Sequence, residues 1–169
     1  MKTKKLVTAA LFAAIVCVAT LAIRIPSGLS GGYVNMGDAG VLLSAYLLGP
    51  LHGGLAGGLG SCLADIAAGY ASFAIPTLVI KFWVAFVGGL LFAKGIKAKS
   101  WIAIAIYGII AECIMIGGYF LVEIWLSGSV FAAAAGIVGN ITQAVFGVVV
   151  STAIYKFLCG KKAVMNFFK

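Results

Sequence analysis

The side chains best suited to contact a small polar ligand occur within apolar segments of this sequence. Glu112, Tyr119 and Glu123 share one face of a predicted helix, at i, i+7 and i+11 spacing. Asn140 and Gln143 are neighbours at i, i+3 on the next predicted helix. Because such groups are costly to place in hydrocarbon, they are expected to face a cavity or one another. The pattern favours recognition of a ligand through hydrogen bonds.

Three further polar residues, Asn35, Asp38 and Lys81, lie nearer the N-terminus and are expected to contribute to the same site. Two interpretations of Lys81 remain open, since its ammonium either pairs with Asp65 or contacts a ligand. Asp38 is interpreted either as the cap of a helix or as a ligand contact.

Each polar residue of the last two predicted helices also has a structural interpretation. Asn140 and Gln143 either join helices through hydrogen bonds or bind a ligand. Glu123 either is solvated at the outer surface or lines the site. Glu112 lies near the middle of its segment, where it needs a proton, a partner or a ligand.

Motifs for catalysis are absent from the sequence. It contains no phosphate-binding G-x-x-x-x-G-K-[ST] loop and no nucleophile elbow, and His52 has no neighbours with metal-ligand spacing. We therefore expect no enzymatic activity, no cofactor and no metal site.

The amino-acid composition indicates that this chain is a membrane protein. Of 169 residues, 63% are hydrophobic and only 9% are charged, and the mean hydropathy is +1.18. Soluble domains are about a quarter charged. At about 20 residues per span, the chain is predicted to be an all-α integral membrane protein, a single domain over residues 1–169 with six transmembrane helices. The predicted spans are approximately 6–25, 36–48, 53–69, 76–93, 101–125 and 130–158.

The net charge of +8 results mainly from lysine clusters that flank apolar segments. This distribution argues against nucleic-acid binding, which requires a basic solvated face. Placing both termini in the cytoplasm puts most lysines inside and none of the four acidic residues there. We expect a multi-pass protein of the cell membrane.

Small residues recur in the first and third predicted helices. Ala9 and Ala13, and likewise Ala10 and Ala14, are four residues apart and make the first helix smooth enough for an external helix to dock. The glycines between residues 53 and 60 are expected to bring the third helix close to its neighbours within the chain.

A run of motifs with a characteristic order resembles the substrate-binding S components of energy-coupling factor (ECF) vitamin importers. The most similar branch is the riboflavin-type branch that includes hydroxymethylpyrimidine and pyridoxine carriers. The motifs are GYVNMGDA at 32–39, LGP at 48–50, GGLGS at 57–61, LAD at 63–65, GY at 69–70 and PTLVIK at 76–81. After Lys81, the last residue of these motifs, related sequences commonly continue with glycine, whereas this chain has Phe82 and Trp83.

The resemblance implies a compact bundle of six helices with an outward vitamin pocket, closed by the loop between the first two helices. It also implies partners, namely a transmembrane coupling subunit that docks on Ala9, Ala10, Ala13 and Ala14, and two ATPase subunits. A pyridoxine-like or hydroxymethylpyrimidine-like ligand is expected. The alternatives are riboflavin, a stand-alone proton-coupled carrier that uses Glu112, and a purely structural membrane subunit.

Overall fold

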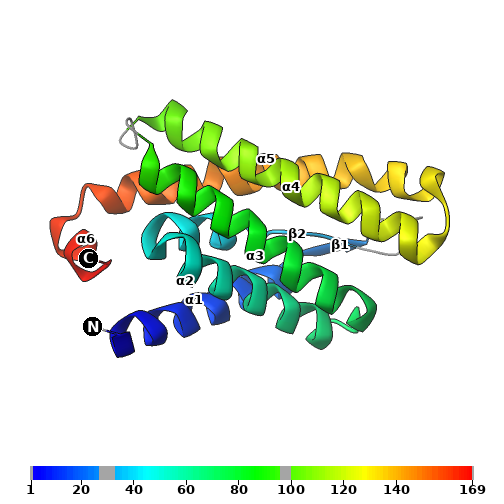
Figure 1. Cartoon of the computed structure of the whole chain (residues 1–169), viewed down its shortest axis with the longest axis horizontal. Helices are drawn as coiled ribbons and strands as arrows, with labels where there is room; N and C mark the ends of the chain where they lie inside the picture. Colours follow the sequence, from blue (N-terminus) through cyan, green and yellow to red (C-terminus); the bar gives the residue numbers. More distant parts are fainter. Residues whose placement is uncertain (1, 27–32, 96–99, 169) are drawn as a thin grey trace.

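The computed structural model describes residues 2–26, 33–95 and 100–168, and helices dominate it (Figure 1). The elements in chain order are α1 (Lys2–Ala22), β1 (Arg24–Pro26), β2 (Tyr33–Asn35), α2 (Asp38–Ala67), α3 (Ala71–Lys94), α4 (Trp101–Ser127), α5 (Val130–Cys159) and α6 (Lys162–Phe168).

Among the described residues, the five helices α1 to α5 are long and apolar enough to cross a membrane. Their outer surfaces carry exposed leucine, isoleucine, valine and phenylalanine side chains, whereas Asp38, Lys81 and Glu112 are buried. Apolar groups outside and charged groups inside are the distribution that a bilayer requires.

Helix α2 is interrupted where the sequence predicts a break, at Gly49 and Pro50. Gly49 has φ 77° and ψ −178°, a conformation that glycine adopts readily and other residues rarely. The Ser44 hydroxyl donates to the Gly53 carbonyl at 3.2 Å, so the chain reverses at the break. The two predicted short segments therefore lie side by side within one element. The count of six spans remains a prediction, since five elements meet the length criterion.

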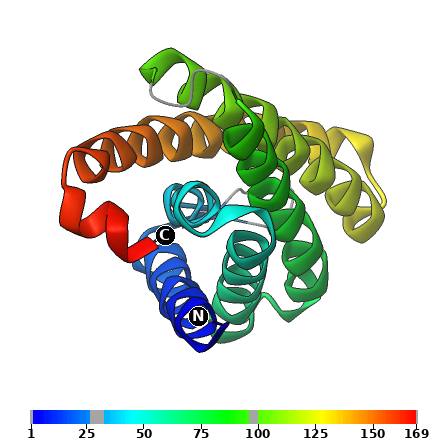
Figure 2. The same cartoon turned by 60° about the vertical axis from the view of Figure 1, so that its left-hand side comes forward.

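The first half of α2 occupies the centre of the bundle (Figure 2). Helix α2 contacts α1, α3 and α5, and the contacts of α4 with both α3 and α5 complete the bundle. Val41, Leu42 and Ala45 are fully buried at this centre. Every polar side chain on α2 that points inward must therefore find its partner inside the protein.

The predicted start of the fourth span at Pro76 is wrong, because α3 begins at Ala71. The amide of Phe73 donates to the carbonyl of Tyr70 at 2.9 Å and forms the first turn. Pro76 follows within the helix, near enough to its start that only one hydrogen bond of the ladder is lost.

The first helix ends at Ala22, earlier than predicted, because the next residues form a strand. Strand β1 pairs with β2 in antiparallel register, with Arg24 opposite Asn35. The all-helical prediction missed this small sheet. Within the loop expected between the first two helices, residues 27–32 lie outside the described residues.

The end of the chain also differs from the prediction. A short helix, α6, follows α5 and turns back toward α1 (Figure 1). The Phe168 ring meets the Phe12 ring edge-on, with 6.1 Å between centroids. The predicted turn between the last two long helices is confirmed, because α4 ends at Ser127 and α5 begins at Val130.

Gly60 marks the closest approach of α2 to α1. A Cβ built on Gly60 would lie 2.4 Å from the carbonyl oxygen of Ala13. We expect Gly60→Ala to lower the free energy of unfolding by about 1 to 2 kcal/mol, because a backbone atom would have to move. Thermal unfolding in detergent measures this change. Gly117→Ala is the matched control, since a Cβ there meets no atom within 4 Å. Equal stability of the two variants would contradict the close packing.

Candidate ligand-binding site

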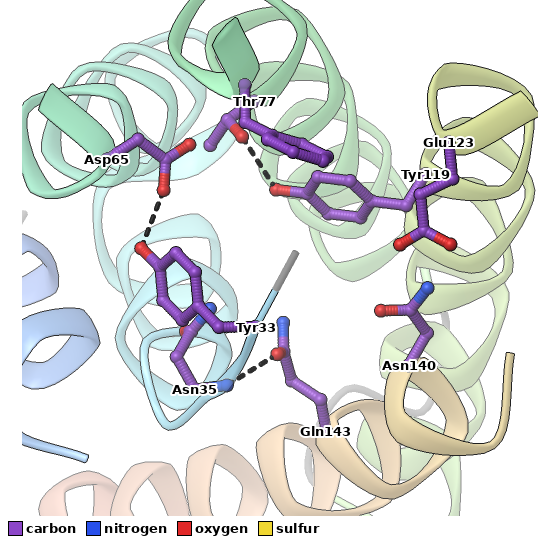
Figure 3. Close-up of a pocket in the computed structure, with 9 residues that line it drawn as sticks. Tyr33, Asn35, Asp65, Thr77, Tyr119, Glu123, Asn140 and Gln143 are labelled. Carbon is purple, nitrogen blue, oxygen red and sulfur yellow. Dashed lines mark hydrogen bonds between the residues drawn. The ribbon is translucent and has the colours of Figure 1, made fainter. Parts of the chain in front are cut away.

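A polar cavity lies toward the end of the bundle where α1 ends and α5 begins (Figure 3). The cavity has a volume of about 20 Å³, which is room for about one water molecule. The lining residues are Tyr33, Asn35, Asp65, Phe73, Thr77, Tyr119, Glu123, Asn140 and Gln143.

A buried ion pair lies directly behind the cavity. The Lys81 ammonium of α3 donates to the carboxylate of Asp38 on α2, and each side chain is at most 2% exposed. The second carboxylate oxygen of Asp38 accepts from the Gln143 side-chain nitrogen on α5. Three helices are thus joined by one carboxylate. The shared carboxylate fixes the orientation of the Gln143 amide at the cavity wall.

Strand β2 is held across the cavity by hydrogen bonds at both its ends. The Tyr33 hydroxyl donates to Asp65 Oδ1 at 2.6 Å, and the backbone amide of Asn35 donates to Gln143 Oε1 at 2.7 Å (Figure 3). Burial raises the pKa of the Tyr33 phenol, and its hydrogen bond to Asp65 raises that pKa further. Tyr33 is therefore a neutral donor at physiological pH. The strand connects the wall formed by α2 with the wall formed by α5.

The remaining walls combine aromatic surface with hydrogen-bonding groups. The hydroxyls of Thr77 and Tyr119 are 2.9 Å apart. The Lys81 ammonium lies 5.2 Å from the centroid of the Tyr119 ring, which is within cation–π distance. Glu123 and Asn140 face each other across one corner of the cavity (Figure 3). The wall therefore offers flat apolar surface beside donors and acceptors.

Asn140 is the clearest unused donor of this site. Its side chain is 7% exposed, and its Nδ2 atom has no hydrogen-bond partner within the part of the chain that the structure describes. Burying a donor without a partner costs about 1 to 3 kcal/mol. A ligand acceptor placed in the cavity would recover that cost.

The structure brings most of the predicted site residues together. Five of the eight line the cavity, namely Asn35, Tyr119, Glu123, Asn140 and Gln143. Of the remaining three, Asp38 and Lys81 form the ion pair behind the wall, and Glu112 lies elsewhere.

Three of the structural interpretations require correction. Lys81 pairs with Asp38 and not with Asp65, because the first turn of α2 faces α3 at this level. Asp38 is not the helix cap, since that position is Gly37 and no side chain caps it. Glu123 is 3% exposed and therefore not solvated. Gln143 does join helices, as its contacts with Asp38 demonstrate.

Glu112 does not line the polar cavity. It is 1% exposed, and neither of its carboxyl oxygens has a hydrogen-bond partner among the described residues. It lies within electrostatic range of Asp38 and Lys81. On its other side is an apolar groove between α4 and α5, which Ile109 and Val145 help to line.

Four lining residues were not predicted as part of the site: Tyr33, Asp65, Phe73 and Thr77. Asp65 carried a usable signal, because an acidic residue within an apolar segment is costly and usually has a role. Nothing in the sequence distinguished Thr77 as a site residue, since threonine is common in membrane helices. Tyr33 is placed by β2, a strand that no pattern in the sequence indicated.

The four alanines predicted to dock a partner divide into two pairs. Ala9 is 6% exposed and belongs to the core, and Ala13 presents its carbonyl to Gly60. Ala10 and Ala14 are exposed on the opposite side of α1. Ala10 and Ala14 are therefore the more exposed pair, whereas Ala9 is buried and Ala13 is partly buried.

The fold and this site define a class of protein, the helical membrane proteins with a polar cavity enclosed among their helices. Residues 1–159 match the family described as "ECF-type riboflavin transporter, S component". The chain belongs to this family, whose members take part in vitamin uptake.

Two individual relatives are similar to this chain over most of its length. The chain is 26% identical over 167 residues to the thiamine precursor transporter HmpT of Lactococcus lactis subsp. cremoris (strain MG1363), covering 98% of this chain and 93% of that protein. It is 41% identical over 135 residues to an "Uncharacterized protein in gap 3'region" of Pyrococcus woesei, covering 80% and 88% respectively.

A solved structure supports the fold. The crystal structure of the S-component for biotin from an ECF-type ABC transporter matches with a TM-score of 0.72 and 21% sequence identity, covering 99% of this chain and 97% of that one. At this identity the match establishes a common fold.

Proposed function

We propose that the chain captures a small polar heterocycle of the hydroxymethylpyrimidine type and delivers it to an ECF module for uptake. The unpartnered Asn140 donor beside an aromatic wall is the observation that carries the proposal. A ring nitrogen of such a ligand would accept from Asn140, and a hydroxyl would donate to Glu123. The thiamine precursor named for HmpT is consistent with this chemistry.

The cavity has room for only about one water molecule, so the walls must separate before any ligand enters. A single ring requires less separation than a flavin, which favours the smaller ligand. A pyridoxine-like ring requires about the same separation and is the second candidate. Strand β2 is the element whose few hydrogen bonds would break.

Transport on this proposal requires no chemistry on the ligand. The cavity faces the outside of the cell membrane and both termini lie in the cytoplasm, as the lysine distribution favours. A transmembrane coupling subunit and two ATPase subunits would supply the energy.

Mass spectrometry of co-purified compounds tests this proposal. Protein purified in detergent from cells grown in rich medium is denatured, and the released small molecules are identified. We expect a pyrimidine or pyridine vitamin precursor in nearly stoichiometric amount. Release of riboflavin would support the alternative ligand. Release of no vitamin or precursor, together with no saturable change of tryptophan fluorescence with any of them, would support a structural subunit.

Glu112 supports a second function, that of a stand-alone proton-coupled carrier. A buried carboxyl without a hydrogen-bond partner among the described residues is suited to binding a proton. Uptake that persists without ATPase subunits and stops when a protonophore is added would favour this function.

The exposed alanine pair leads to a prediction about the partner. We expect Ala10→Leu with Ala14→Leu to reduce co-purification of the coupling subunit about tenfold or more, because leucine prevents close helix approach. Ligand affinity should not change. Ile15→Leu is the control, because Ile15 is also exposed on α1 but does not share the i, i+4 stripe of Ala10 and Ala14. Complete recovery of the complex with the double variant would show that this face of α1 does not dock the coupling subunit.

A further inference from the structure

A second cavity lies at the opposite end of the bundle, where α1 begins and α6 ends. It encloses about 280 Å³ and combines cationic, polar and aromatic side chains. Helix α6, the red segment beside α1 in Figure 2, contributes Phe167 and Phe168 to its lining. The lining residues are Lys4, Lys5, Thr8, Leu48, His52, Phe167 and Phe168.

The lysines of this cavity have no acidic side chain near them. The sequence contains only four aspartates and glutamates. Asp38 pairs with Lys81, Asp65 accepts from Tyr33, and Glu112 and Glu123 are buried in α4. The Lys4 ammonium instead lies 4.3 Å from the centroid of the Phe167 ring. The cavity is therefore electropositive, and a ligand that fills it would be an anion.

The surroundings of the cavity point to an amphiphilic anion. Leu6 and Val7 on α1 and Leu51 on α2 are exposed next to the lining residues. These side chains extend the apolar outer surface of the bundle up to the lysines. A molecule with a phosphate at the lysines and hydrocarbon chains along this surface would match both parts. Basic pockets at membrane-helix ends are suited to lipid head groups.

We propose that this cavity binds the head group of an anionic phospholipid. Lys4 and Lys5 contact the phosphate, His52 provides a further hydrogen bond, and Phe167 and Phe168 cover the glycerol region. The lipid then anchors α6 to α1 and holds this end of the bundle at the membrane surface. The site is separate from the polar cavity between α2 and α5, and it does not depend on the identity of the vitamin.

The test uses the full-length chain in mixed micelles containing either phosphatidylglycerol or phosphatidylcholine. Native mass spectrometry measures the retained lipid, and thermal unfolding measures stability. We expect retention of one phosphatidylglycerol and a higher melting temperature with that lipid. Lys4→Gln with Lys5→Gln should weaken retention about thirtyfold, from about fivefold per lysine near a membrane surface.

The matched control is Lys161→Gln with Lys162→Gln, which removes two exposed lysines outside the cavity lining. This control should retain the lipid within about twofold of the unmodified chain, because neither lysine lines the cavity. Its loss of net charge equals that of the Lys4 and Lys5 variant, so the comparison separates contact within the cavity from overall charge. Melting temperatures in phosphatidylcholine show that both variants fold. Equal loss in both variants, or no preference for phosphatidylglycerol, would overturn the proposal. Displacement of the lipid by millimolar inorganic phosphate would likewise overturn it in favour of a free-phosphate site.

Discussion

Asp38→Asn is expected to lower the free energy of unfolding by about 3 to 5 kcal/mol, the usual cost of breaking a buried ion pair from one side. The substitution preserves shape but leaves the ammonium of Lys81, a residue that is 1% exposed, without its counter-charge. It also changes the acceptor that orients Gln143. Thermal or denaturant unfolding of the purified chain in detergent measures the loss.

Two further variants make this result specific. Lys81→Met added to Asp38→Asn should restore part of the stability, because no buried charge is then unpaired. Lys94→Gln, which removes an exposed lysine from the end of the same helix α3, should have little effect. A double variant as unstable as the sum of its parts would mean that the two side chains do not interact.

Asn140→Ala is expected to weaken binding of hydroxymethylpyrimidine by about 1 to 3 kcal/mol, or about 5- to 150-fold. The variant removes the one donor of the cavity wall that lacks an internal partner among the described residues, so a ligand acceptor would stay unsatisfied. Quenching of tryptophan fluorescence during a ligand titration gives the dissociation constant.

Thr142→Ala is the control for that variant, on the same helix α5. The Thr142 hydroxyl donates to the Val138 carbonyl of its own helix and is exposed, so its loss should leave affinity unchanged. Equal affinity of Asn140→Ala and the unmodified chain would place the ligand elsewhere.

The sequence predicted the helix face on which a side chain lies better than the position of that side chain along the bundle. Helical spacing correctly placed Tyr119 and Glu123 on one wall. It also grouped Glu112 with them, although eleven residues along a helix separate Glu112 from Glu123 by about 16 Å. The cavity ends before that depth is reached, and its depth depends on how β2 and α2 fill the bundle.

The partner of Lys81 depended on tertiary structure. Asp38 and Asp65 both lie on α2, and the reversal at Gly49 decides which of them meets α3 at the level of Lys81. Local patterns cannot resolve that choice. The strands and α6 were missed for a similar reason. Each is too short to be stable alone, and contacts such as Phe12 with Phe168 hold them in place.

Calorimetric titration of the purified chain with hydroxymethylpyrimidine, alongside pyridoxine, riboflavin and biotin, tests the central claim most directly. The account predicts saturable binding of one hydroxymethylpyrimidine per chain, weakened in Asn140→Ala and unchanged in Thr142→Ala. Tighter binding of riboflavin or biotin, or hydroxymethylpyrimidine binding that does not depend on Asn140, would contradict it.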